Sequence, residues 1–124
     1  MAYRGIRGAI GVDTNDADVI IAATRELLGH IVSANGLAVE DVASVIFTAT
    51  PDLDAVYPAR AARDMGWVHT PLLCMQEMMV EGSLPRCVRV LVLWNTDVPP
   101  EHIRHVYLGA ARVLRPDLVE AGPA

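Results

Sequence analysis

The sequence predicts an α+β fold in which a mixed β-sheet carries helices packed on one face. Segments rich in β-branched residues alternate with amphipathic, helix-like segments in the order β-α-β-α-β-β. The length of 124 residues fits one domain, which we place at residues 1–118, with a flexible tail over 119–124. The chain is 52% hydrophobic and only 20% charged. This apolar excess predicts that the second sheet face is buried against other copies of the chain.

The first half of the chain contains two expected strands with a helix between them. Tyr3–Gly11 and Val42–Ala49 are the strands, the second being rich in β-branched residues. Residues 13–16 supply N-cap candidates, and apolar side chains then follow at helical spacing over residues 20–32. The Asn-Gly pair at 35–36 is a natural left-handed stop, so we expect the helix to end there.

The second half is expected to hold shorter elements. Pro58 fits the first turn of a short helix over residues 59–65. Strands are predicted over 71–75 and 87–94, and a last short strand within 103–108. A helical turn should follow, ended by Pro116.

Arg89 is the most informative single residue, because it stands in the otherwise apolar run 88–94, which is typical of a strand buried on both faces. A guanidinium keeps its proton even there and needs an anion or several acceptors. One interpretation is an arginine that reaches water or pairs with an internal carboxylate. The other is an arginine at the floor of a pocket that receives an anionic ligand.

Other polar side chains are candidates for the same pocket: Arg7, Arg60, Arg63, Glu77, Tyr107 and Arg115. Several guanidiniums and one carboxylate in apolar surroundings suit a small polyanionic organic substrate. Arg60 and Arg63 lie three residues apart, hence on one helix face, which could equally be a solvated face. Glu77 could equally be a structural partner of an arginine.

Composition and charge exclude several other functions. The net charge of −5 argues against a nucleic-acid partner. No uncharged apolar run reaches the length of about 18 residues that a membrane span needs. The N-terminus lacks the apolar core of a signal peptide, so we expect a cytoplasmic protein.

The cysteines and histidines give weaker signals. Cys74 with His102 or His105 could form a nucleophile and base, but its apolar neighbours favour an inert, packed thiol. The two histidines with Asp97 or Cys87 lack the spacing of a zinc site. We therefore expect free thiols, no metal and no cofactor.

Eight short segments carry a family resemblance: residues 4–9 (RGIRGA), 49–53 (ATPDL), 57–60 (YPAR), 74–78 (CMQEM), 87–90 (CVRV), 96–99 (TDVP), 103–108 (IRHVYL) and 113–118 (VLRPDL). In this order and spacing they resemble the monofunctional AroH-type chorismate mutases, a class distinct from the all-helical enzymes. The resemblance covers residues 3–118, nearly the whole chain.

The resemblance implies a homotrimeric isomerase whose sheets form a pseudo-α/β-barrel, with sites at the subunit clefts. It implies conversion of chorismate to prephenate, on the route to phenylalanine and tyrosine. One subunit would supply the catalytic residues Arg7, Cys74, Glu77, Arg89 and Tyr107. The neighbour would bring the substrate-binding residues Tyr57, Ala59, Arg60 and Arg63. Further substrate contacts are expected from Leu72, Leu73, Leu114 and Arg115.

Two departures from the family pattern stand within these expected contacts. Arg60 occupies a position where relatives often have lysine, so the charge is kept while the geometry can differ. Leu72 and Leu73 replace a smaller or more polar pair.

The implied reaction is a concerted pericyclic shift that moves no proton and forms no covalent intermediate, which agrees with the lack of a convincing nucleophile, base or metal site. It predicts a flat pH–rate profile across neutrality. Two alternatives remain open at this point. One is a trimeric imine or enamine deaminase of similar architecture, and the other is a non-catalytic trimer that binds a metabolite of the aromatic pathway.

Overall fold

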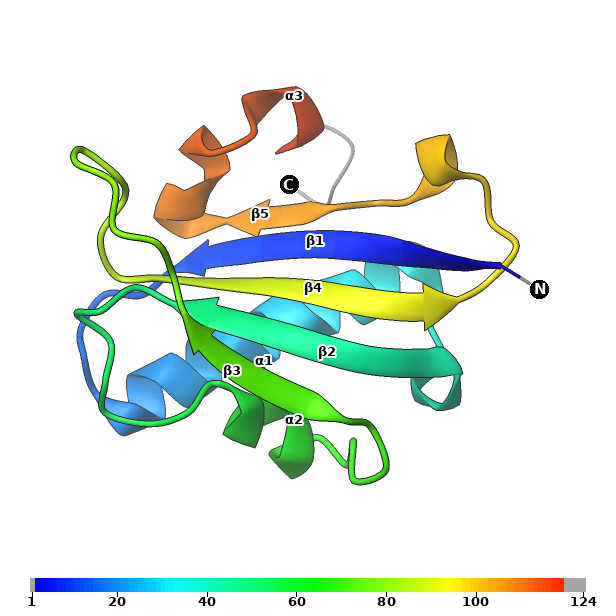
Figure 1. Ribbon diagram of the computed structural model, residues 1–124, viewed down its shortest axis with the longest axis horizontal. Helices are drawn as coiled ribbons and strands as arrows, with labels where there is room; N and C mark the ends of the chain where they lie inside the picture. The colour runs from blue at the N-terminus through cyan, green and yellow to red at the C-terminus, as the bar shows by residue number, and fades with distance from the viewer. Residues whose placement is uncertain (1, 120–124) are drawn as a thin grey trace.

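The computed structural model describes residues 2–119 and contains one five-stranded mixed sheet in the order β3-β2-β4-β1-β5 (Figure 1). The predicted fold class and element order are confirmed. The strands and the two longer helices are β1 (Tyr3–Gly11), α1 (Ala17–Asn35), β2 (Val42–Ala49), α2 (Ala59–Asp64), β3 (Leu72–Gln76), β4 (Cys87–Asn95) and β5 (Val106–Leu108). β4 is antiparallel to β1 and β2, whereas β5 and β3 pair in parallel with β1 and β2.

Helix α1 covers one face of the sheet (Figure 1). It begins after Asp16, whose carboxylate accepts from the Val19 N–H at 3.1 Å, and it ends at Gly36, whose φ is 62°. The packing is tight where α1 crosses β1, because a Cβ added at Gly8 would lie 2.9 Å from Ile31 Cδ1. Burial of the apolar stripe, including Leu27, against the sheet forms the core.

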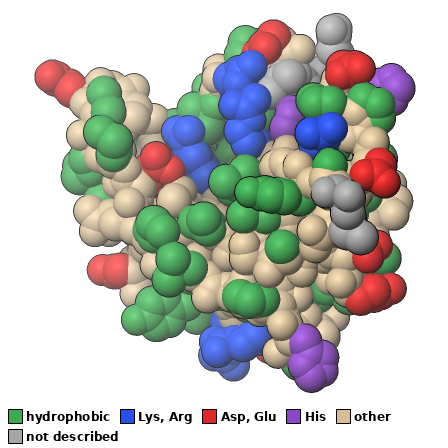
Figure 2. Space-filling view, turned by 45° about the vertical axis from the view of Figure 1, so that its right-hand side comes forward, with side chains coloured by type: hydrophobic (Ala, Val, Ile, Leu, Met, Phe, Trp, Pro, Cys, Tyr) green, Lys and Arg blue, Asp and Glu red, His purple; other side chains and the backbone are tan. Residues whose placement is uncertain are grey.

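The open face of the sheet agrees with the predicted packing of helices on one face, since within this chain β4 is covered on one side only. Val88, Val90, Val92 and Trp94 are at most 6% exposed against the helices, but the residues between them are only half-buried. The apolar open face includes Leu91, Leu93, Tyr3, Leu73 and Met75, of which the last three are exposed. Figure 2 shows hydrophobic side chains spread over one side of the molecule, with most of the visible arginines near the upper edge and others at the lower edge. The strand is apolar on both sides, yet this chain covers only one of them.

The C-terminal region differs in one respect from the prediction. A 3-10 helix over Gly109–Val113 follows β5, and Pro116 then begins helix α3 (Pro116–Val119) and ends no helical turn. Proline suits the first helical position because its missing N–H would have no partner there and its φ is already helical. The predicted tail lies mostly outside the described residues, which stop at 119.

Candidate active site

A pocket of about 590 Å³, called the Arg89 pocket below, opens on the uncovered face of the sheet. It brings together six residues predicted for the site: Arg7, Glu77, Arg89, Tyr107, Leu114 and Arg115. Its remaining lining consists of Gly8, Ile46, Thr48, Val90 and Leu91. The pocket thus draws on β1, β2, β4, β5 and the segment that follows β5.

Strand register explains why these side chains meet. Arg89 on the central strand β4 stands opposite Ala9 of β1 and Thr48 of β2. Ala9 in turn pairs with Tyr107 of β5. Directly opposed residues of neighbouring strands project from the same sheet face, so the register gathers these residues on the open face. Glu77 joins them because its N–H donates to the Ala49 carbonyl at 2.9 Å and continues the pairing of β3 with β2.

Arg89 lies close to one carboxylate without being fully paired. Its Nε is 3.5 Å from Glu77 Oε1, which is an ion-pair distance but too long for a good hydrogen bond. This Nε is buried and has no hydrogen-bond partner in the described part of the chain, although the side chain as a whole is 41% exposed. The structure combines the two interpretations of Arg89 given above. Arg89 lies beside an internal carboxylate, and it also lines a pocket.

Glu77 has a second and closer neighbour that the sequence analysis missed. The Thr48 hydroxyl donates to Glu77 Oε1 at 2.5 Å. A threonine in a strand is ordinary, and its role is visible only in the strand register. Thr48 stands beside Arg89 on one side and beside Met75, two residues before Glu77, on the other.

Arg7 is supported by another residue that the sequence analysis left out of the site, His105. The backbone N–H of Arg7 donates to His105 Nδ1 at 2.9 Å. Burial lowers the pKa of His105, and the nearby charges of Arg7 and Arg115 lower it further. The imidazole is therefore held in its neutral form, the only form in which Nδ1 can accept this hydrogen bond.

Tyr107 and Arg115 line the pocket on the side of β5, where Tyr107 is buried and Arg115 is partly exposed. Tyr107 is 8% exposed and packs in a small cluster with Ala9, Cys87 and Ala111. Arg115 is partly exposed and forms a two-pronged contact with Asp117, with Nη2–Oδ2 at 2.9 Å and Nε–Oδ1 at 3.1 Å. This hydrogen-bonded contact lowers the pKa of Asp117. The Arg115 guanidinium thus lines the pocket and is paired with an exposed acid.

The other predicted site residues gather elsewhere, around a cavity of about 460 Å³ between α2 and β3, called the α2–β3 pocket below. Six predicted residues line it: Tyr57, Ala59, Arg63, Leu72, Leu73 and Cys74. Arg60 is exposed on α2 and lines neither of these two pockets.

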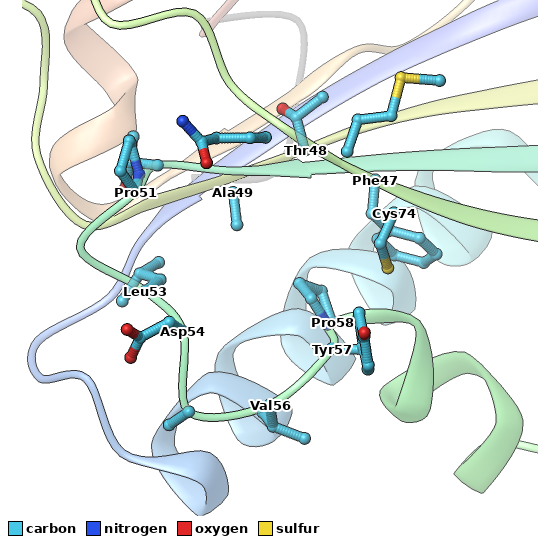
Figure 3. A pocket seen from close by; sticks show the side chains of 14 residues that line it. Phe47, Thr48, Ala49, Pro51, Leu53, Asp54, Val56, Tyr57, Pro58 and Cys74 are labelled. Atoms are coloured by element: carbon cyan, nitrogen blue, oxygen red, sulfur yellow. The ribbon is translucent and has the colours of Figure 1, made fainter.

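Cys74 therefore does not lie in the pocket of Glu77 and Arg89, with which the resemblance grouped it. Side chains alternate along a strand, so Cys74 points to the helix-covered face of the sheet. In Figure 3 its sulfur lies on the same side of the sheet as Tyr57 and Pro58, and Thr48 projects from the other side. Burial raises the pKa of the Cys74 thiol, which agrees with a thiol that is not a nucleophile.

A further cavity of about 610 Å³ adjoins the α2–β3 pocket and shares Tyr57 and Cys74 with it (Figure 3). Apolar side chains from β2 and the loop before α2 form much of its wall. Its acid, Asp54, already accepts from Asn15 Nδ2 at 2.7 Å, and its N–H donates to Asn15 Oδ1 at 3.0 Å. We therefore assign Asp54 a structural role in the loop.

No helix within residues 2–119 combines the length and the apolar character needed to cross a bilayer.

Comparison with known proteins bears on the chemistry of these pockets. Residues 3–118 match the family described as chorismate mutase type I. The chain is 54% identical over 119 residues to "Chorismate mutase AroH" of Thermus thermophilus, covering 95% of this chain and 98% of that protein. It is 49% identical over 119 residues to "Chorismate mutase AroH" of Bacillus subtilis (strain 168), covering 95% and 94%.

A solved structure agrees with these relatives. The chorismate mutase from Clostridium thermocellum superimposes with a TM-score of 0.87 at 51% sequence identity, covering 89% of this chain and 98% of that one. All three proteins are named as chorismate mutases, which favours this activity over the deaminase and over the non-catalytic trimer. The chain belongs to the chorismate mutase type I family, and it is accordingly an isomerase.

Proposed function

We propose that this chorismate mutase converts chorismate to prephenate by holding the substrate in a compact conformation and stabilising the charge of the transition state. Arg89 would donate to the ether oxygen whose bond breaks. The observation that carries the proposal is the Arg89 Nε, a buried donor beside an open pocket with no hydrogen-bond partner among the described residues. Such a donor lacks an acceptor, and a substrate oxygen can supply one once the neighbouring side chains make room for it.

The rearrangement asks for charge placement more than for acid–base chemistry. A C–O bond breaks while a C–C bond forms, and negative charge develops on the ether oxygen as positive charge develops on the ring. Arg89 is fixed on the central strand of the sheet, so its dipoles and charge need no reorganisation as the reaction proceeds. Its contribution to rate depends on how much more strongly it binds the transition state than the ground state.

Glu77 has the opposite assignment. A carboxylate does not attract a dianionic substrate, but it can accept from the ring hydroxyl and favour a ring that becomes positive. The side chain is 24% exposed and lies in the same pocket as Arg89. Arg89 thus places a positive charge near the ether oxygen, which becomes negative, and Glu77 places a negative charge near the ring, which becomes positive.

The substrate carboxylates need cationic or hydrogen-bonding partners that hold the flexible arm in a near-attack shape. We assign one carboxylate to Arg7 and Tyr107, which line the same pocket on the neighbouring strands β1 and β5. Arg115 and Leu114 would close the rim. Because Asp117 neutralises Arg115 in this structure, substrate binding there would exchange one carboxylate for another.

A homotrimer would bring the two pockets together. The α2–β3 pocket would face the Arg89 pocket of a neighbouring subunit and complete the site with Tyr57, Ala59, Arg63 and Cys74, and Arg60 would guard its entrance. The exposed apolar side chains of the open sheet face support such an assembly. In this arrangement Cys74 would approach the substrate as a weak polar contact from the neighbour. We further propose a cytoplasmic location, in keeping with two free cysteines.

The test compares Arg89→Ala with the exposed-site control Arg25→Ala. We expect Arg89→Ala to lower kcat about a thousandfold or more, the scale of a lost oxyanion donor or larger. Arg25→Ala should keep normal turnover. Loss of chorismate absorbance measures the rate, and native mass spectrometry of both variants measures the assembly. Near-normal turnover of Arg89→Ala would overturn the mechanism, and a monomeric native protein would overturn the shared site.

A further inference from the structure

We propose that Thr48 is a positioning residue for the mutase reaction: its hydroxyl holds the Glu77 carboxylate and thereby keeps it from pairing with the Arg89 Nε. The inference rests on the roles proposed above for Glu77 and Arg89. It concerns a neutral side chain that lines the Arg89 pocket at the end of β2.

The geometry sets two donors against one acceptor atom. Thr48 Oγ1 lies 2.5 Å from Glu77 Oε1, and Arg89 Nε lies 3.5 Å from the same oxygen. A hydrogen bond needs a separation near 3 Å, so the hydroxyl has the bond and the guanidinium has only the longer electrostatic contact. Thr48 is the cross-strand neighbour of Arg89, which places its hydroxyl between the acid and the strand that carries the guanidinium.

The consequence for catalysis follows from what Glu77 would do without this hydroxyl. A carboxylate 3.5 Å from a buried guanidinium donor gains a charge-assisted hydrogen bond by moving a few tenths of an ångström. Arg89 would then enter the reaction with its Nε already paired, and the ether oxygen would have to compete with a full negative charge. Binding of the substrate carboxylate assigned to Arg7 and Tyr107 would not be affected by this change. The loss should therefore appear in kcat and hardly in KM.

The experiment uses isosteric variants of two threonines that lie two residues apart. Thr48→Val keeps the shape and the β-branching but removes the hydroxyl, and Thr48→Ser keeps the hydroxyl. Thr50→Val is the matched control, since the Thr50 hydroxyl accepts from the Cys87 N–H and donates to Asp52 outside the Arg89 pocket. We expect Thr48→Val to lower kcat about ten- to hundredfold, the scale of one lost charge-assisted hydrogen bond, with KM within about threefold. Thr48→Ser and Thr50→Val should keep kcat within about threefold.

Two further readouts separate positioning from other roles. In a Glu77→Ala background, Thr48→Val should change kcat by less than about threefold, because no carboxylate remains to be held. A crystal structure of Thr48→Val should show Arg89 Nε within hydrogen-bond distance of Glu77. Because valine suits a strand, the thermal midpoint of Thr48→Val should not fall, and lost activity with a lowered midpoint would indicate a structural role instead.

The possible failures are distinct. If Glu77→Ala alone leaves kcat unchanged, the proposed role of Glu77 is wrong, and this inference falls with it. If Glu77→Ala lowers kcat and Thr48→Val does not, the positioning role alone is wrong. If Thr48→Val lowers kcat equally in both backgrounds, the hydroxyl acts on the substrate directly and does not position Glu77.

Discussion

Two groups of polar side chains adjoin the start of β4, one at Cys87 and the other at Arg89. They differ in how completely their hydrogen-bond donors and acceptors are paired. In the first group, Thr50 Oγ1 donates to Asp52 and accepts from the Cys87 N–H at 3.0 Å. Asp52 accepts from the Arg86 N–H, and Arg86 Nε donates to the Val12 carbonyl at 3.2 Å. This group holds Arg86 at a φ of 45°, a strained value for a residue other than glycine.

The second group, formed by Thr48, Glu77 and Arg89, lies a few residues further along and is incomplete. Its guanidinium Nε is buried without a hydrogen-bond partner in the described chain. An unmade hydrogen bond at a buried group lowers stability, whereas the group around Thr50 has matched donors and acceptors. The difference shows that neighbouring polar groups along one strand can have different roles. The group around Thr50 stabilises the fold, and the group around Arg89 keeps a hydrogen-bond donor unpaired for the substrate.

The largest test of this comparison replaces Arg89 by methionine, which removes the charge and keeps a long side chain. We expect turnover to fall about a thousandfold or more. The free energy of unfolding should stay level or rise by about 1 kcal/mol, because the variant removes a buried Nε that has no hydrogen-bond partner among the described residues. Urea titration beside the chorismate assay measures both. A large loss of stability in this variant would show that Arg89 is a structural residue.

Thr50→Val tests the opposite group and should show the opposite result. The variant leaves the buried Cys87 N–H without its acceptor, so the free energy of unfolding should fall by about 1–3 kcal/mol. Its kcat should remain close to normal, as stated above. Denaturant unfolding gives the stability, and an unchanged midpoint would contradict the view that this group fixes the start of β4.

The smallest expected effect concerns His105 and pH. Its folded pKa is lowered, so between that value and its usual value of about 6.5 the unfolded chain binds more protons. His105 therefore contributes stability that is fully present above pH of about 6.5 and is lost as the pH falls through the folded pKa. Because the residue is half-buried, we expect a contribution below about 1 kcal/mol.

The control for this pH effect is His105→Asn, whose amide oxygen can accept from Arg7 without titrating. Unfolding free energies measured from pH 8 to pH 5 should decline more steeply for the native chain than for the variant. Identical slopes would mean that the imidazole is not held neutral by its surroundings. The kcat of the native enzyme should stay flat across neutrality, since the reaction moves no proton.

Much of the fold follows from local sequence signals. The strands over Tyr3–Gly11 and Val42–Ala49 form at their predicted bounds, and α1 ends at the predicted Asn35-Gly36 stop. These elements could be predicted because period, caps and β-branching act locally. The apolar run of β4 does not by itself tell which face the helices cover, because an apolar side chain packs equally well against a helix or another chain.

The site was predictable in part. Six residues meet in one pocket as the resemblance suggested, and the separation of Cys74 from Glu77 was available in the sequence, because residues three apart in a strand point to opposite faces. Thr48 carries no sequence signal of its own, and the weak signal of His105 indicated a base or a metal ligand and not a partner of Arg7. Their partners, Glu77 and Arg7, are distant in the chain, so only strand register and tertiary packing reveal their roles.

Gly8 joins the helix layer to the pocket, and this has a consequence for how the enzyme can evolve. Its backbone lines the Arg89 pocket, and on its other side an added Cβ would lie 2.9 Å from Ile31 Cδ1, so the end of that side chain would have to shift. A larger residue at this position therefore requires the side chains of α1 that face it to move. A mutational scan of a large gene library should find this site nearly invariant, while compensating changes would have to arise in α1, far from the chemistry they protect.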